Sequence, residues 1–126
     1  MRTKIVLVED DPLLIDIYST KFKEEGFEVS VVDRGDAAVP HIAKEKPDLV
    51  VLDIVLPQQD GWDILKTIKS SDKTKDIKVV ILSNLGQKEE IEKGMALGAA
   101  GYLIKAHHTP SEVVREIKKI LAGPLV

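Results

Sequence analysis

Five residues whose side chains could do chemistry follow directly after short apolar stretches of the sequence. They are Glu9, Asp10, Asp53, Ser83 and Lys105. Alone, each has an ordinary explanation; Asp53, for example, could simply cap or turn the chain. If the apolar stretches are parallel strands, however, their carboxyl ends meet at one edge of a sheet. The sequence therefore predicts that these polar side chains converge on one crevice.

Three carboxylates in one crevice would need compensating positive charge. Two carboxylates about 4 Å apart repel each other by roughly 4 kcal/mol at an effective dielectric constant of 20. A divalent cation and the ammonium group of Lys105 would provide the compensation. Because the ligands would all be oxygen atoms, the pattern suits Mg²⁺ or Mn²⁺.

The segments that must position these residues alternate between short apolar runs and amphipathic stretches. Strands are expected over Ile5–Val8, Phe27–Val32, Asp48–Leu52, Ile77–Leu82 and Gly101–Ile104. Helices are expected from Pro12 to about Glu25, from Gly35 to just before Pro47, from Trp62 to about Ser70, from Gln87 to Leu97, and from Pro110 to about Ala122. Five alternations predict an α/β protein with a parallel sheet and helices on both faces.

Local signals mark where several of these helices begin and end. Asp11 precedes Pro12 and is interpreted as a helix cap rather than a metal ligand. Thr109–Glu112 has the pattern of a capping box, and Gly98 suits the position just after a helix. The apolar positions that recur at helical spacing in the first helix are Leu14, Ile17, Tyr18 and Phe22.

Composition narrows the class of protein. The chain has 126 residues, enough for one domain with a hydrophobic core and too few for two. Its formal net charge of -3 argues against direct binding to nucleic acid or to an anionic membrane. The absence of cysteine excludes disulfides and thiolate metal sites and is compatible with the reducing cytoplasm. The apolar run before Glu9, Ile5–Val8, has only four residues, too few for a signal peptide or a membrane span.

Taken together, the motifs resemble those of the CheY-like receiver domain of two-component response regulators. The residues that carry the resemblance are Glu9-Asp10, Asp53 with the following Leu56-Pro57-Gln58-Gln59-Asp60-Gly61, Ser83, and Tyr102-Leu103-Ile104-Lys105. The resemblance covers nearly the whole chain and implies a flavodoxin-like (βα)5 fold in three layers with strand order 2-1-3-4-5. It implies a receiver domain over residues 1–122, with 123–126 as a short tail or the start of a linker.

The resemblance also implies roles for the acidic residues. Asp53 matches the phosphoacceptor, whose carboxylate attacks a phosphohistidine of a partner and becomes an aspartyl phosphate. Asp10, Asp53 and the backbone carbonyl of Val55 match the Mg²⁺ ligands. Glu9 would act mostly through metal-bound water.

Three further positions match residues that respond to the phosphoryl group. Lys105 would pair with a phosphoryl oxygen, Ser83 would move to hydrogen-bond the phosphate, and the rotamer of Tyr102 would follow that movement. Together they would switch a surface formed by the fourth helix, the fifth strand and the fifth helix. Without the resemblance, Ser83 would be interpreted as a turn residue and Tyr102 as a packing residue.

The implied partners are proteins. A sensor histidine kinase or a phosphotransfer protein would supply the phosphoryl group, and a downstream protein or a missing output domain would respond. No direct contact with nucleic acid or membrane is expected, and a phosphorylation-dependent dimer remains open. The domain would be a signalling switch and not an enzyme, since it would catalyse only its own phosphorylation and slow dephosphorylation. It would be a stand-alone regulator or a receiver cut from a longer protein.

The chain departs from the family pattern in several places. Ala106 follows Lys105 where proline is usual, and a cis bond before alanine would cost about 3 kcal/mol, so a trans peptide is expected. Asn84 stands where a small residue is usual and would narrow access to the pocket. Pro40 would kink its helix if it lay beyond the first turn. Val55 and Leu85, which flank the site, are apolar; we hypothesise that they exclude water and lengthen the life of the phosphoryl group.

Other functions fit the sequence less well. A flavodoxin would need phosphate-cradling groups where Glu9-Asp10-Asp11 stands, and a haloacid dehalogenase-type phosphohydrolase would need a second acid where Val55 stands. A P-loop is absent. The remaining alternative is a pseudo-receiver, an interaction module that is never phosphorylated. Three histidines are spaced too irregularly for a metal site and are interpreted as surface residues: His41, His107 and His108.

Overall fold

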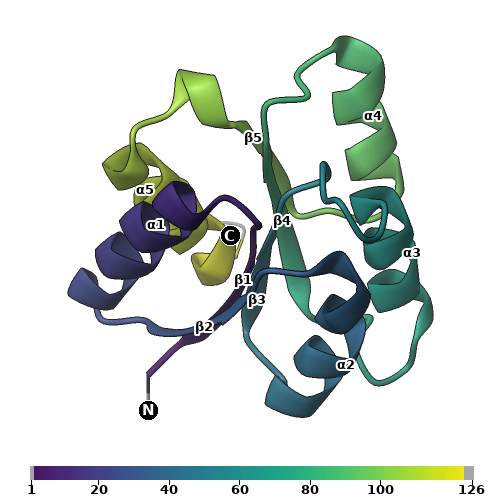
Figure 1. Ribbon diagram of the computed structural model, residues 1–126, viewed down its shortest axis with the longest axis horizontal. Helices are drawn as coiled ribbons and strands as arrows, with labels where there is room; N and C mark the ends of the chain where they lie inside the picture. Colours follow the sequence, from purple (N-terminus) through teal and green to yellow (C-terminus); the bar gives the residue numbers. More distant parts are fainter. Residues whose placement is uncertain (1, 124–126) are drawn as a thin grey trace.

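Five parallel strands form one sheet between two layers of helices in the computed structural model, which describes residues 2–123 (Figure 1). The strands are β1 Lys4–Val8, β2 Glu28–Val32, β3 Leu49–Leu52, β4 Lys78–Ser83 and β5 Gly101–Ile104. The helices are α1 Pro12–Glu24, α2 Gly35–Glu45, α3 Gly61–Ser70, α4 Lys88–Ala96 and α5 Pro110–Ala122, with a 3₁₀ turn η1 at Lys105–His107. The sheet order is β2-β1-β3-β4-β5, which confirms the predicted fold.

The strand register brings the carboxyl ends of the strands to one edge of the sheet. Val8 at the end of β1 pairs with Leu52 at the end of β3, and Leu52 pairs with Ile81 in β4. Ser83, the last residue of β4, pairs with Ile104, the last residue of β5. The residues at and just after these strand ends are therefore held at this edge, as the sequence predicted for the polar side chains, although Ser83 ends β4 instead of following it.

Alternate residues of the central strands face two separate hydrophobic cores. α1 and α5 cover one face of the sheet, and α2, α3 and α4 lie on the other (Figure 1). The first core includes Tyr18, Phe22, Leu49, Val51 and Ile117, and the second includes Ile42, Val50, Leu52, Ile64 and Leu65. Each of these aliphatic side chains contributes about 1.5–3 kcal/mol through burial, so the two cores hold the sheet edge in place.

Most of the predicted helix ends are confirmed. The Asp11 carboxylate accepts hydrogen bonds from the backbone N–H groups of the first turn of α1. In α5, Thr109 Oγ1 accepts from the N–H of Glu112, whose carboxylate accepts in return from the N–H of Thr109. Gly98 follows α4 with a φ of +103°, a conformation that L side chains rarely adopt.

Three local features go beyond the sequence prediction. Ile17 shares the helical spacing of Tyr18 and Phe22 but is 38% exposed, because the buried face of α1 is formed by those two residues. Pro40 is the sixth residue of α2, beyond its first turn, and the helix continues to Glu45 as its predicted range implied. Pro40 itself is exposed, so water can reach the carbonyl that it leaves without a helical donor. The 3₁₀ turn after β5 was not predicted.

Two further sequence predictions concern the tail of the chain and membrane-spanning segments. Of the predicted tail at 123–126, only residue 123 lies within the described part of the chain. Within residues 2–123, no helix combines the length and the apolar character that crossing a membrane requires.

Candidate functional site

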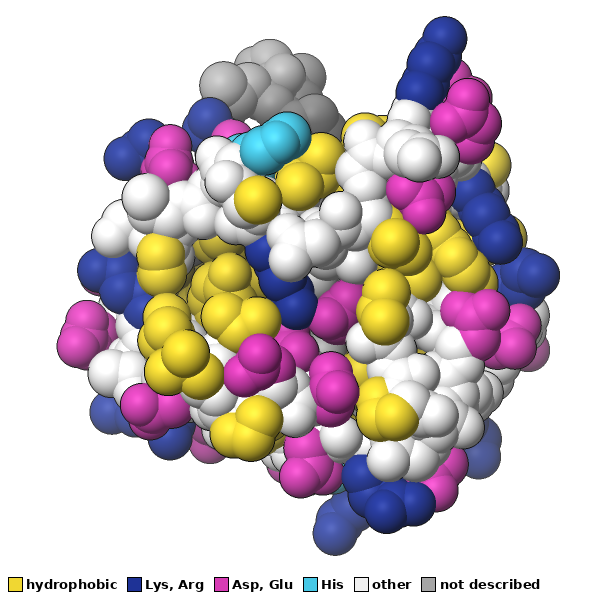
Figure 2. All heavy atoms as spheres, turned by 45° about the horizontal axis from the view of Figure 1, so that its top comes forward, with side chains coloured by type: hydrophobic (Ala, Val, Ile, Leu, Met, Phe, Trp, Pro, Cys, Tyr) yellow, Lys and Arg dark blue, Asp and Glu magenta, His cyan; other side chains and the backbone are white. Residues whose placement is uncertain are grey.

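All the candidate site residues except Tyr102 line one open pocket at the carboxyl edge of the sheet. The pocket has a volume of about 350 Å³. Acidic and basic side chains meet near the middle of this side of the molecule, between two groups of hydrophobic side chains (Figure 2). The pocket is lined by Glu9, Asp10, Asp11, Leu14, Asp53, Val55, Ser83, Asn84 and Lys105. The predicted convergence of five polar side chains is therefore present.

The centre of the pocket is a lysine held between two buried carboxylates. Lys105 Nζ lies 2.7 Å from Asp53 Oδ2 and 2.6 Å from Glu9 Oε1. The side chains are 10% exposed for Lys105, 8% for Asp53 and 2% for Glu9, so little solvent screens the interaction. Charge-assisted hydrogen bonds of this length are among the stronger ones in proteins.

Burial and charge shift the proton affinities of this cluster. Burial would lower the pKa of Lys105, but its hydrogen bonds to Asp53 and Glu9 outweigh that effect and the pKa is raised. Burial raises the pKa of Glu9, even though the hydrogen bonds from Lys105 and from the backbone N–H of Asp11 act in the opposite direction. Lys105 therefore stays charged at neutral pH.

Backbone groups orient both buried carboxylates. Glu9 Oε2 accepts from the N–H groups of Asp10 and Asp11, each at 3.1 Å. Asp53 Oδ1 accepts from the N–H of Val55 at 3.1 Å. Asp53 therefore does stabilise a turn, as its ordinary interpretation suggested, but its second oxygen remains directed at Lys105.

The loop after Asp53 is held by a close backbone approach. The N–H of Gly61, at the start of α3, donates to the carbonyl of Ile54 at 3.0 Å. A Cβ on Gly61 would lie only 2.4 Å from Cα of Ile54. Glycine is therefore required at this position if the loop that carries Asp53 and Val55 is to pack against α3.

The donor set fits a hard divalent cation. One carboxylate oxygen each from Glu9, Asp10 and Asp53 lies within 4.8 Å of the others. Asp10 is exposed while the other two are buried, so the cluster opens to solvent on one side. Three carboxylates beside an open face match the oxygen ligands and retained waters that Mg²⁺ prefers. Asp11 belongs to the helix cap and not to this cluster.

The loop after β4 contacts the strand that precedes Lys105. Ser83 is fully buried, and its Oγ accepts from the N–H of Leu85 at 3.4 Å. The Tyr102 hydroxyl donates to the carbonyl of Leu85. Burial raises the pKa of Tyr102, so the phenol remains a donor at neutral pH. Tyr102 thus contacts the loop that follows Ser83 and does more than fill the core.

Comparison with known proteins assigns the chain to a family. The family model described as "Response regulator receiver domain" matches residues 5–118. The chain belongs to this family. It is therefore a CheY-like receiver domain of the two-component type, as the sequence motifs predicted.

Named relatives agree with this assignment. The receiver domain is 32% identical over 121 residues to the phosphate regulon transcriptional regulatory protein PhoB of Rhizobium meliloti, covering 96% of this chain and 53% of the relative. It is 37% identical over 118 residues to the regulatory protein VanRc of Enterococcus gallinarum, covering 94% and 49%. The chain thus spans about half the length of the curated relatives it matches.

Solved structures show the same fold. The BeF₃-activated N-terminal receiver domain of Klebsiella pneumoniae RstA superposes with a TM-score of 0.86 at 32% identity, covering 94% of this chain and 98% of the other. The chemotaxis response regulator CheY4 of Vibrio cholerae gives a TM-score of 0.88 at 22% identity, covering 95% and 99%.

Some features of this receiver domain were not found by sequence reasoning. Lys105 was expected to compensate the three carboxylates, but its direct contact with Glu9 was not predicted, because Glu9 was assigned to bind the cation through water. Asn84 was expected to narrow the pocket, but its side chain also accepts a hydrogen bond from the N–H of Ala106 at 3.1 Å. The Lys105–Ala106 peptide is trans, as expected from the missing proline. The sequence did contain a signal for the hydrogen bond from Ala106: proline, which is usual at this position, has no N–H to donate, whereas alanine has one.

The histidines take no part in the pocket. His41, on α2, lies 2.6 Å from Ser30 Oγ on β2 through its Nε2 atom. His107 is exposed in η1, and His108 follows it. Within residues 2–123, the cluster of potential metal ligands contains carboxylates and no histidine.

Proposed function

We propose that this receiver domain accepts a phosphoryl group on Asp53 in a reaction that requires Mg²⁺. The observation that carries the proposal is the position of Lys105, which lies within 2.7 Å of Asp53 and beside the acidic cluster. A carboxylate, a neighbouring ammonium and a set of cation ligands are the groups that phosphoryl transfer to an acid needs.

In the proposed reaction, an oxygen of Asp53 attacks the phosphorus of a phosphohistidine on a sensor kinase or a phosphotransfer protein. The P–N bond breaks as the O–P bond forms, and the histidine leaves with a proton from solvent. Mg²⁺, held by Asp10, Asp53 and the carbonyl of Val55 and through water by Glu9, would offset the charge on the phosphoryl oxygens. Lys105 exchanges its hydrogen bond with Asp53 for one with a phosphoryl oxygen.

The same residues couple the pocket to the protein surface. Ser83 hydrogen-bonds the phosphoryl group, and Tyr102 follows through its contact with Leu85. Tyr102 lies on β5, beside α4 and ahead of α5. The α4-β5-α5 surface therefore changes its population of conformations when Asp53 is phosphorylated.

We further propose that the receiver domain occupies residues 1–122 and works in the cytoplasm as a switch rather than a metabolic enzyme. Several curated relatives are named as transcriptional regulators and are about twice as long as this chain. An output domain or a separate downstream protein would therefore read the switch. The proposal also allows the domain to form a dimer with a second copy when Asp53 is phosphorylated.

Incubation with acetyl phosphate and Mg²⁺, followed by intact-mass measurement, tests the proposal. Wild type should gain one phosphoryl group, and Asp53→Asn should gain none. Asp48→Asn is the matched control, because Asp48 is exposed and outside the pocket, and it should behave as wild type. If wild type gains no mass, the domain is a pseudo-receiver that acts only through protein contacts.

A further inference from the structure

Two loops of the pocket begin side by side. The pairing of β4 with β5 ends at Ser83 and Ile104, which are partners in the register. Beyond them, the chain continues as the loop 84–87 on one side and as η1, which carries Lys105, on the other. The ladder of backbone hydrogen bonds has therefore ended where the two loops approach the pocket.

A side chain continues the connection beyond the ladder. Asn84 Oδ1 accepts from the N–H of Ala106 at 3.1 Å. The next residue of the same loop, Leu85, accepts from the hydroxyl of Tyr102 through its carbonyl. Two consecutive residues after Ser83 are thus bound to the segment that surrounds Lys105. We call the first of these contacts the Asn84–Ala106 link.

The link depends on the residue types at both of its ends. Proline at position 106 would have no N–H to donate, so the alanine makes the donor available. Asn84 is exposed and lines the pocket, but its carbonyl oxygen is directed at the neighbouring loop. A small aliphatic side chain at position 84 would leave the N–H of Ala106 to water.

We propose that Asn84 is a positioning residue that holds the Ser83 loop against the Lys105 turn before any phosphoryl group arrives. The hydroxyl of Ser83 and the ammonium of Lys105, which lies between Glu9 and Asp53, are then kept at a constant spacing in the pocket. Phosphoryl binding does not have to order the two loops, so its apparent affinity is higher. This inference rests on the proposed function, because it concerns the same pocket.

Three variants separate the effect of losing the Asn84–Ala106 link from the effect of changing the width of the pocket. Asn84→Ala removes the acceptor and widens the pocket. Asn84→Leu removes the acceptor but keeps the branching and the number of non-hydrogen atoms, so it does not widen the pocket. Asn84→Asp keeps an acceptor of the same shape. Because Asn84 is exposed, none of these variants should change the urea midpoint of unfolding by much. Comparable midpoints confirm that each variant is folded.

The first measurement is the ¹H–¹⁵N resonance of the Ala106 amide in the unphosphorylated protein. We expect its proton to move upfield in Asn84→Ala and Asn84→Leu, and to stay near the wild-type position in Asn84→Asp. The same resonance position in all four proteins would overturn the link.

The second measurement is the BeF₃⁻ concentration that half-saturates the protein in excess Mg²⁺. We expect it to rise about two- to tenfold in both Asn84→Ala and Asn84→Leu, the range that corresponds to one ordinary hydrogen bond. If Asn84 acts only by narrowing the pocket, Asn84→Ala binds as tightly as wild type or more tightly, and the proposal is overturned.

The two proposals can fail separately. A wild-type protein that takes up neither acetyl phosphate nor BeF₃⁻ contradicts the proposed function itself. A wild-type protein that takes up both, with unchanged half-saturation in Asn84→Ala and Asn84→Leu, contradicts only the positioning role of Asn84.

Discussion

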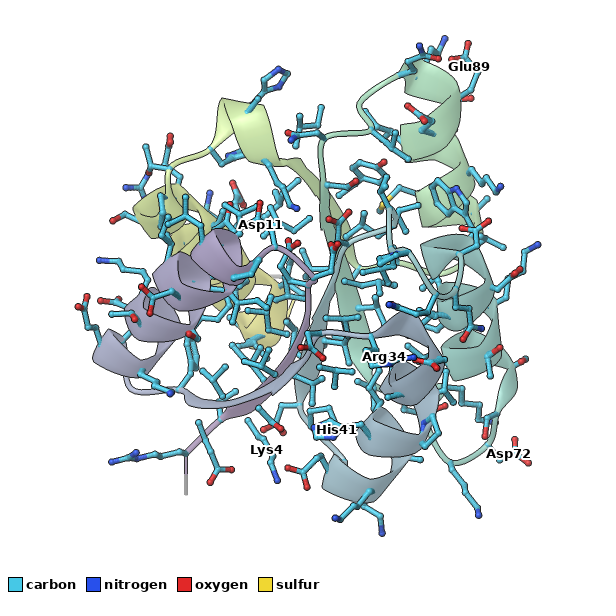
Figure 3. The ribbon with its side chains drawn as sticks, viewed as in Figure 1. Lys4, Asp11, Arg34, His41, Asp72 and Glu89 are labelled. Atoms are coloured by element: carbon cyan, nitrogen blue, oxygen red, sulfur yellow. The ribbon has the colours of Figure 1, made fainter. Side chains whose placement is uncertain are left out.

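The two ends of the sheet use the same kinds of charged residue in opposite ways. Lys4 begins β1 at the amino end and lies far from Asp11, which follows the other end of the strand (Figure 3). Lys4 Nζ lies 3.5 Å from Glu45 and 3.8 Å from Glu28, and its side chain is 27% exposed. At the carboxyl end, Lys105 has two acidic partners within 2.7 Å and is 10% exposed.

The difference shows that burial, more than the number of ion pairs, distinguishes a site from an ordinary surface. Partly exposed pairs such as those of Lys4 are screened by water and contribute at most about 1 kcal/mol each. Buried charges lose their hydration and depend on one another, so the loss of one leaves the others uncompensated. In the proposed function, this cluster of three acids and a lysine binds a cation and a phosphoryl group.

The largest expected difference between the two ends comes from removing each lysine. Lys105→Met should lower the free energy of unfolding by about 2–4 kcal/mol, because Glu9 and Asp53 then repel each other without a cation between them. Lys4→Met should lower it by less than about 1 kcal/mol. Urea unfolding in metal-free buffer measures both. Equal losses in the two variants would contradict the comparison.

Mg²⁺ should stabilise the folded protein through the acidic cluster at the carboxyl end of the sheet, and not through residues at the amino end. At ten times its dissociation constant, a cation that binds only the folded state adds about 1.4 kcal/mol to the free energy of unfolding. We expect this gain in wild type, a much smaller gain in Asp10→Asn, and the full gain in Asp48→Asn, whose side chain lies at the amino end. Thermal unfolding with and without Mg²⁺ provides the measurement. A full gain in Asp10→Asn would remove that residue from the cation site.

A buried and an exposed glutamate should respond to pH with opposite signs. Burial raises the pKa of Glu9, so its charged form disfavours folding. That cost is absent below the ordinary pKa of glutamate and grows as the pH rises to the raised value. The hydrogen bond from Lys118 lowers the pKa of Glu25, so its stabilising effect is present above the ordinary pKa and is lost as the pH falls through the lowered value.

Glu9→Gln and Glu25→Gln test these signs in metal-free buffer. As the pH rises from about 3 to 8, Glu9→Gln should become more stable relative to wild type, and Glu25→Gln should become less stable. Urea midpoints at several pH values provide the measurement. The comparison is wrong if both differences change with pH in the same direction.

The smallest expected effect concerns the apolar rim of the pocket. Val55 is 58% exposed and lines the pocket, and we expect it to exclude water from the phosphorylated Asp53. Val55→Asn should speed the loss of the phosphoryl group about threefold, which corresponds to an activation free energy lowered by less than about 1 kcal/mol. Val31→Asn is the control, because Val31 is 37% exposed on β2 and does not line the pocket. Equal decay in Val55→Asn and wild type, followed by intact mass, would discard the idea.

The sequence alone determined the order of the elements, several of their ends and the identity of the family. These features depend on local signals, such as the apolar runs, the cap at Asp11 and the capping box at Thr109, which act over a few residues. The convergence of Asp53 and Lys105 could also be predicted, because the carboxyl ends of parallel strands share one edge whatever the side chains are.

Only the tertiary structure decided which of these neighbours are in contact. Lys105 meets Glu9 as well as Asp53, and Asn84 meets the N–H of Ala106, because the strand register and the 3₁₀ turn set distances that no local pattern encodes. Contacts between residues far apart in the chain depend on packing, and packing is a property of the whole fold.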